Sequence, residues 1–262
     1  MPWTSINGIR LYYLVQGHGP AVVFAHGAGG NHLSWWQQVP FFAERYRCVV
    51  FDHRAFGRTK DETEGPGRRS FADDLRALLD HLEIERAAIV AQSMGGRTAV
   101  GFSYRNPERV SALVLAGTTG GAVSDTVRAA QEEHRQTPMG KRTLYQRAIS
   151  PRLERERPDL AHLYRLIARL NPPRPKDFLA PIPGYRGSSA QFLGDLGVPI
   201  LFLVGAEDTI IPPHVVRLAH EAVPGSQYDE IADAGHSAYF EKADVFNERV
   251  GRFLQESGWT SE

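Results

Sequence analysis

Ala87-Ala88-Ile89-Val90-Ala91-Gln92-Ser93-Met94-Gly95-Gly96-Arg97 begins as an apolar run of β-strand length and continues as a small-residue segment of helical character. Ser93 stands at the junction, flanked by Ala91, Gly95 and Gly96. A chain that turns from strand to helix within one or two residues needs little side-chain bulk, and the turning residue itself is strained. The stretch therefore predicts a serine that projects from the top of a sheet at a helix N-terminus, where unpaired N–H groups collect.

Apolar runs of this kind alternate with helical segments along most of the chain. Continuous apolar runs are typical of strands buried on both faces, and their alternation with helices predicts a parallel, doubly wound α/β sheet. The runs occupy residues 21–25, 48–51, 87–91, 112–116, 198–204 and 228–231. Residues 9–16 follow Asn7-Gly8, a pair that favours a hairpin turn, so we expect the first two strands to be antiparallel.

The alternation stops between residues 122 and 190, where no strand-like run occurs. Helical periodicity appears over residues 127–135, 141–149 and 160–170, and it is interrupted by prolines. We interpret residues 122–190 as a helical insertion into one core domain formed by residues 1–121 and 191–262. The alternative is a peripheral helical excursion that never reaches the functional site.

The segment Ala91-Gln92-Ser93-Met94-Gly95 resembles the nucleophile elbow of the α/β-hydrolase family, with Ala91 in place of the first glycine of G-x-S-x-G. The resemblance extends in order and spacing over residues 9–121 and 196–256. It implies the α/β-hydrolase fold, with residues 122–190 as a helical cap inserted after the sixth strand. Within the family, the elbow is similar to that of esterases, enol-lactonases and carbon–carbon bond hydrolases.

A serine hydroxyl needs a base within hydrogen-bond reach, usually a histidine, and that histidine needs an acceptor on its other nitrogen. Such groups converge at the carboxyl ends of parallel strands. Asp208 and His236 each follow a predicted strand, in the order Ser, acid, His, and both resemble the corresponding family segments. They complete a predicted catalytic triad with Ser93. Glu207 is the adjacent alternative acid. The alternatives to a catalytic role are that Asp208 only forms a turn and that His236 lies on its loop by chance.

The family resemblance also implies an oxyanion hole made by the backbone N–H groups of Ala28 and Met94. Ala28 lies in His26-Gly27-Ala28-Gly29-Gly30, where glycines let the backbone turn its N–H groups inward. The alternative is a tight strand–helix turn without a ligand. We expect His26 to support this loop, and Asp52 to stabilise structure, rather than to act in catalysis.

Composition excludes several classes of function. Lysines and arginines balance aspartates and glutamates at 30 each, which predicts no nucleic-acid partner. Cys48 is the single cysteine, so no disulfide framework or cysteine metal site forms within the chain. The sequence shows no secretory signal pattern and no apolar run of about 18–20 residues, from which we expect a cytoplasmic protein without a membrane partner. No metal spacing or cofactor motif appears, and oligomeric state stays open.

These observations predict a cofactor-free serine hydrolase that cleaves a small carboxylic ester or lactone through an acyl-enzyme on Ser93. The alternatives are hydrolysis of a carbon–carbon bond in a dienoic or diketone substrate by the same triad, or a non-hydrolytic receptor or oxygenase on the same fold. Specificity is expected to reside mostly in the insertion. Tyr145, Tyr164 and Phe178 could line the site, and Trp35 or Trp36 could face it, but the sequence does not select among them.

Overall fold

The computed structural model describes residues 2–62, 64–122, 124–138, 142–175, 177–180 and 189–260. The chain opens with the predicted antiparallel hairpin, in which β1 (Trp3–Ile6) pairs with β2 (Ile9–Gln16). Asn7 and Gly8 take φ values of +43° and +79°, so both turn residues are in the left-handed region that an Asn-Gly hairpin requires.

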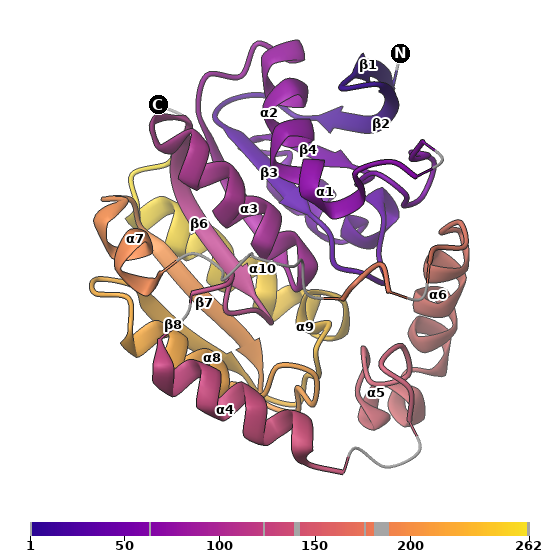
Figure 1. Ribbon diagram of the computed structural model, residues 1–262, viewed down its shortest axis with the longest axis vertical. Coiled ribbons are helices and arrows are strands. Elements are labelled where there is room, and N and C mark those ends of the chain that lie inside the picture. Colours follow the sequence, from indigo (N-terminus) through magenta and orange to yellow (C-terminus); the bar gives the residue numbers. More distant parts are fainter. Residues whose placement is uncertain are drawn as a thin grey trace.

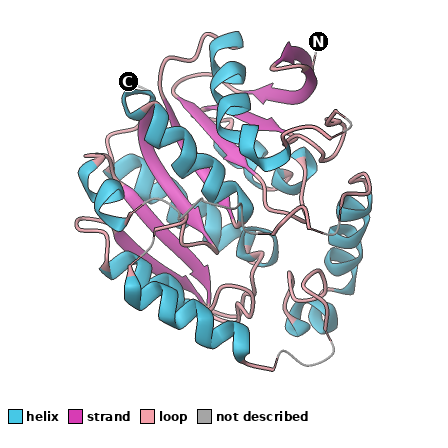
Figure 2. Cartoon of the chain, in the orientation of Figure 1, coloured by secondary structure: helices cyan, strands magenta, loops and turns pink. Residues whose placement is uncertain are grey.

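The described residues form one eight-stranded sheet in the order β1-β2-β4-β3-β5-β6-β7-β8. From β4 to β8 in this order every neighbouring pair is parallel, as the buried apolar runs predict (Figure 2). The carboxyl ends of these strands therefore meet at one edge of the sheet. The strands are β3 (Ala21–Ala25), β4 (Arg47–Phe51), β5 (Ala87–Gln92), β6 (Val110–Ala116), β7 (Ile200–Gly205) and β8 (Gln227–Ile231).

Helices cover both faces of the sheet and bury one apolar cluster on each. One cluster includes side chains of α2 (Phe71–His81), α3 (Met94–Arg105) and α8 (Pro213–Glu221). The other includes side chains of α1 (Gln38–Phe42) and α10 (Ala243–Glu256). In Figure 1, α2 and α3 lie in front of the sheet and α10 lies behind it. None of the helices that the structure describes has the length and apolar character needed to cross a bilayer.

Short elements complete the connections between these layers. The 3-10 turns η1 (His32–Trp35), η2 (Gly67–Ser70) and η3 (Pro107–Arg109) precede α1, α2 and β6, respectively. The helix α7 (Ala190–Asp195) leads into β7, and α9 (Ala238–Glu241) follows β8.

Between β6 and β7 the described residues contain helices and turns but no ladder strand. The predicted helices over 127–135 and 160–170 are confirmed as α4 (Asp125–Gln136) and α6 (Pro158–Arg169), and α5 (Pro151–Glu156) lies between them. Residues 123, 139–141, 176 and 181–188 of the predicted insertion lie outside the described residues.

The helix predicted over residues 141–149 is wrong for the part that the structure describes, because residues 142–149 form turns and bends. Two reciprocal bonds account for this: the amide of Thr143 donates to the Gln146 side chain, and the amide of Gln146 donates to the Thr143 hydroxyl. Such side-chain bonds satisfy backbone groups outside a helix, and they compete with helix formation at these positions.

Candidate active site

Ser93 occupies the sharp turn between β5 and α3, with φ +51° and ψ −113°. Its amide donates to the carbonyl of Ala116 on β6 at 2.9 Å, which ties the turn to the sheet. A Cβ at Gly95 would lie 2.2 Å from the Ala25 carbonyl oxygen, and one at Gly96 would lie 2.5 Å from the Thr118 side chain. The strained serine and the small neighbours that let strand and helix approach are therefore both present, as predicted.

Asp208 and His236 are brought together at the same edge of the sheet, where both side chains are buried. One carboxylate oxygen of Asp208 accepts from the amides of Ile210 and Ile211 at 2.7 and 2.9 Å, which fixes its orientation. The other oxygen lies 2.8 Å from His236 Nδ1. Because a carboxylate can only accept, this bond places a proton on Nδ1, and Nε2 is the acceptor in the corresponding neutral tautomer.

The neighbouring acid positions are not available to His236. Glu207 accepts two hydrogen bonds from Arg152 of α5, at 2.8 and 3.0 Å. At the end of β6, where the family can also carry an acid, the chain has Gly117, and a Cβ there would lie 3.3 Å from His236 Nδ1 and 3.4 Å from Asp208 Oδ2. The geometry thus pairs His236 with Asp208.

Ser93 and His236 line one cavity of about 400 Å³ together with Ala28, Gly29 and Gln92. Gln92 is a site residue that sequence reasoning missed, although it lies inside the elbow motif. Its Nε2 donates to the backbone carbonyl of His236 at 3.2 Å, so the residue before the serine also holds the loop of the histidine. Gln92 is a polar residue at the end of an apolar run and directly before the predicted nucleophile, and this position could have identified it.

The loop after β3, in which the oxyanion donor Ala28 is predicted, lies close to the side chain of Gln92. A Cβ at Gly27 would lie 1.9 Å from Gln92 Oε1, so a larger residue here would displace the Gln92 side chain, which binds the His236 carbonyl. Among the hydrogen bonds between described residues, none uses the amide of Ala28 or of Met94 as donor. Both N–H groups are therefore available to a ligand oxygen.

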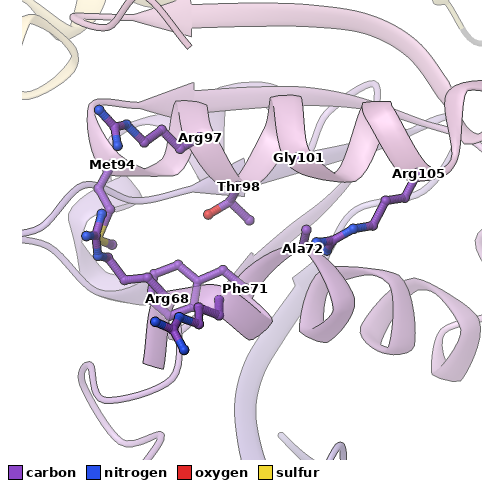
Figure 3. A pocket seen from close by; sticks show the side chains of 9 residues that line it. Arg68, Phe71, Ala72, Met94, Arg97, Thr98, Gly101 and Arg105 are labelled. Atoms are coloured by element: carbon purple, nitrogen blue, oxygen red, sulfur yellow. The ribbon is translucent and has the colours of Figure 1, made fainter. Parts of the chain in front are cut away.

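Met94, the residue after Ser93, is not among the residues that line the catalytic cavity. Its side chain lines a second, smaller cavity of about 180 Å³ beside Arg68, Phe71 and Arg97. Figure 3 shows these side chains around the start of α3. Neither Ser93 nor His236 lines this second cavity. The two cavities therefore lie next to the same turn between β5 and α3, but only the first contains the proposed reactive groups.

His26 and Asp52 have the supporting roles expected of them. The His26 ring is fully buried, its Nδ1 lies 2.8 Å from the Gly27 carbonyl, and its Nε2 accepts from the His53 amide at 3.0 Å. Burial lowers the pKa of His26 to about 4, so the ring is neutral near pH 7. Asp52 accepts from both the amide and the ring of His32. Both side chains are thus occupied within the loops that flank the cavity.

The segment between β6 and β7 supplies much of the cavity wall. Tyr145, Tyr164 and Arg174 line it, whereas Phe178, Trp35 and Trp36 do not. Trp35 is buried in the core, and Trp36 is partly exposed. Sequence reasoning named the two tyrosines without selecting them and missed Arg174, which stands in a proline-rich stretch without periodicity.

Arg174 brings a positive charge to the wall. Its guanidinium lies 4.0 Å from the centre of the Phe56 ring, and it donates to the Ala55 carbonyl at 3.2 Å and to the Ala28 carbonyl at 3.4 Å. Burial lowers its pKa from the usual arginine value. No carboxylate among the described residues pairs with it, so its charge is uncompensated within that part of the chain.

Two asparagines attach this wall to the core. Asn171 donates to the Gly29 carbonyl at 3.2 Å and accepts from the Gly57 amide at 2.8 Å. Asn31 donates to the Ile167 carbonyl at the end of α6 at 2.9 Å. The C-terminal end of α6 is therefore fixed directly against the loop after β3.

Comparison with known proteins identifies the family and the fold. A family model described as the alpha/beta hydrolase fold matches residues 20–181 and 177–243. A 2-hydroxy-6-oxononadienedioate/2-hydroxy-6-oxononatrienedioate hydrolase of Paraburkholderia xenovorans is 30% identical, over 94% of this chain and 91% of that relative. A thermophilic esterase from Thermogutta terrifontis superimposes with a TM-score of 0.81 at 26% identity, covering 98% of this chain and 97% of that one. Est816, an N-acyl homoserine lactone degrading enzyme, superimposes with a TM-score of 0.77 at 27% identity, covering 96% and 100%.

Proposed function

The chain belongs to the α/β-hydrolase family, and from this premise we propose that it is a serine hydrolase that cleaves a small carboxylic ester or lactone. One observation carries the proposal. Ser93, strained at φ +51°, shares a cavity with His236, whose Nδ1 lies 2.8 Å from Asp208 Oδ2. Strain at a serine beside an oriented imidazole is the arrangement that nucleophilic catalysis needs.

In the proposed mechanism, Ser93 Oγ attacks the substrate carbonyl carbon while His236 Nε2 takes the hydroxyl proton. The C=O electron pair moves to the carbonyl oxygen, and collapse of the tetrahedral intermediate expels the alcohol, which receives the proton from His236. Water then attacks the acyl-enzyme, again with His236 as base, and releases the acid and free Ser93. Asp208 orients His236 and stabilises the imidazolium that forms.

The amides of Ala28 and Met94 are the proposed donors to the oxyanion. Each preorganised donor of this kind is worth roughly 3 kcal/mol in the transition state. His26 holds this loop by its bonds to Gly27 and His53. We assign residues 122–190 as the cap that covers this site.

The size of the cavity supports a small substrate. A volume of about 400 Å³ lies near the lower end of ligand pockets, which span about 300–1,000 Å³. Its core side carries the reactive groups, and its wall includes the apolar side chains of Leu144, Leu179 and Ile210. The esterase and the lactone-degrading enzyme among the similar structures support the same substrate class.

The test combines p-nitrophenyl esters of increasing acyl length with a fluorophosphonate probe, on the wild type and on Ser93→Ala. We expect ester turnover with a burst of p-nitrophenol, and labelling that Ser93→Ala abolishes. Folded wild-type protein that the probe does not label would contradict the assignment of Ser93. Labelling without turnover of any ester would instead favour the receptor or a carbon–carbon substrate.

Hydrolysis of a carbon–carbon bond is the second candidate, and Arg174 is the observation that favours it. An uncompensated guanidinium in the wall suits a substrate that carries a carboxylate. The Paraburkholderia relative is named for hydrolysis of a dienedioate, a substrate with two such groups. Product analysis separates the candidates, since carbon–carbon cleavage of a dienedioate releases two carboxylic acids and no alcohol.

A further inference from the structure

The Tyr164 hydroxyl reaches the catalytic cavity from the cap side. The residue lies on α6, is 7% exposed and lines the same cavity as Ser93 and His236. Its ring packs edge-on against Phe240, with ring centres 5.2 Å apart at an interplanar angle of 82°. A Cβ at Gly29 would lie 3.4 Å from the Tyr164 oxygen, so the hydroxyl lies against the loop that carries the Ala28 amide.

The hydrogen bonds around Tyr164 leave its proton free. Ser237 Oγ donates to the Tyr164 oxygen at 3.1 Å. Among the hydrogen bonds between described residues, none has the Tyr164 O–H as donor. An oxygen that accepts a hydrogen bond becomes a stronger donor through its own O–H, so the bond from Ser237 polarises the Tyr164 proton.

The position of the hydroxyl is fixed by the core. Asn31 binds the Ile167 carbonyl one turn along α6 from Tyr164, and Asn171 binds the Gly29 carbonyl. Burial raises the pKa of Tyr164 above its usual value, so the phenol keeps its proton over the pH range in which esterases are assayed. A rigid, protonated donor thus stands beside the oxyanion loop.

We propose that Tyr164 is a further catalytic residue, which donates a third hydrogen bond to the oxyanion beside the amides of Ala28 and Met94. The proposal rests on the proposed hydrolase function. The proton stays on the phenol: as the Ser93 Oγ–carbon bond forms, the carbonyl π electrons move to oxygen, and Tyr164 O–H stabilises the charge that develops there. Its bond contributes more in the tetrahedral state than in the bound substrate.

Tyr164→Phe tests this role, with Tyr104→Phe as the control. Tyr104 lies on α3, is exposed and does not line the catalytic cavity. Three quantities are measured for each variant: kcat/KM for the best p-nitrophenyl ester, the inhibition constant of an alkyl trifluoromethyl ketone, and that of the corresponding methyl ketone. The trifluoromethyl ketone forms an oxyanion adduct on serine, whereas the methyl ketone mimics only the bound substrate.

For Tyr164→Phe we expect kcat/KM to fall about 100-fold and inhibition by the trifluoromethyl ketone to weaken by the same factor. Inhibition by the methyl ketone should not change, and Tyr104→Phe should leave all three quantities as in the wild type. Ser237→Ala, which keeps the phenol but removes the bond to its oxygen, should produce a smaller loss in the first two quantities.

Three results would overturn the proposal: unchanged kinetics in Tyr164→Phe, equal losses for both ketones, or a loss in kcat/KM without weaker trifluoromethyl ketone inhibition. Equal losses would mean that the phenol shapes the pocket in the ground state. These failures differ from failure of the proposed function, because in each of them the wild type still turns over ester and is labelled at Ser93.

Discussion

The edge of the sheet and the wall that faces it differ in how their side chains are positioned. At the edge, Ser93 follows β5 directly and Asp208 lies three residues after β7, and hydrogen bonds with backbone groups hold both. In the wall, Tyr164 comes from α6, whereas Tyr145 and Arg174 come from turns and irregular segments, and contacts of their own side chains hold all three. The sheet therefore determines where the proposed reactive groups lie, whereas the side chains of the wall can be substituted without moving those groups.

The largest expected effect is at the edge. Asp208→Asn keeps the shape of the side chain but presents the wrong hydrogen-bond pattern to His236 Nδ1, so we expect kcat to fall about 10,000-fold with the fold intact. Steady-state kinetics with circular dichroism measure this. Glu207→Gln is the control: Glu207 binds Arg152 and should leave kcat unchanged. A modest loss in Asp208→Asn and a large one in Glu207→Gln would reverse the assignment of the acid.

A second substitution tests the close approach behind Ser93. Gly95→Ala places a Cβ 2.2 Å from the Ala25 carbonyl oxygen, a backbone atom that cannot rotate away. We expect the free energy of unfolding to fall by about 3 kcal/mol. Gly101→Ala makes the same change two turns along α3, where a Cβ meets Ala72 at 3.5 Å, and it should be neutral or stabilising by up to about 1 kcal/mol. Equal urea midpoints for the two variants would contradict this account of the elbow.

The third prediction concerns the pH dependence of stability near the loop after β3. The pKa of His26 is about 4 in the folded protein and near 6.5 when unfolded, so the unfolded state binds more protons between these values. The contribution of His26 to the free energy of unfolding is fully present above about pH 6.5. It is lost as the pH falls through the pKa of the folded state, which lowers the free energy of unfolding by about 3 kcal/mol. Urea unfolding at a series of pH values measures the slope. For His26→Gln, the free energy of unfolding should fall less steeply with decreasing pH below pH 6.5 and should run parallel to the wild-type curve above it. An unchanged slope below pH 6.5 would show that His26 is not the group responsible.

The smallest effect is expected in the wall, where specificity should change without stability. Leu144 lines the cavity from a turn, and Leu144→Trp should narrow it. We expect turnover of longer p-nitrophenyl esters to fall about tenfold relative to acetate, with a change in unfolding free energy within about 0.5 kcal/mol. Leu166→Trp, on α6 but outside the cavity lining, is the control and should keep the wild-type chain-length profile. If both variants shift the profile alike, the wall does not select by direct contact.

The same contrast explains what could be predicted from the sequence. Buried parallel strands are uninterrupted apolar runs, so the sheet was predictable, and with it the loops that carry Ser93, Asp208 and His236. The helix α6 in the wall was predictable as well, but its attachment to the core was not, because the contacts join distant residues: Asn171 binds Gly29 across 142 positions. Locally, the reciprocal Thr143 and Gln146 bonds replaced a predicted helix with turns.

Asn171 also has a consequence for recombination between relatives. Its single amide group contacts two core loops, donating to the Gly29 carbonyl and accepting from the Gly57 amide. A graft that replaces the wall but ends before Asn171 keeps this junction, whereas one that extends past it removes a bond to each loop at once. The boundary of a segment exchanged to change substrate preference should therefore lie on the N-terminal side of Asn171. Asn31 makes the corresponding contact from the core, to the Ile167 carbonyl.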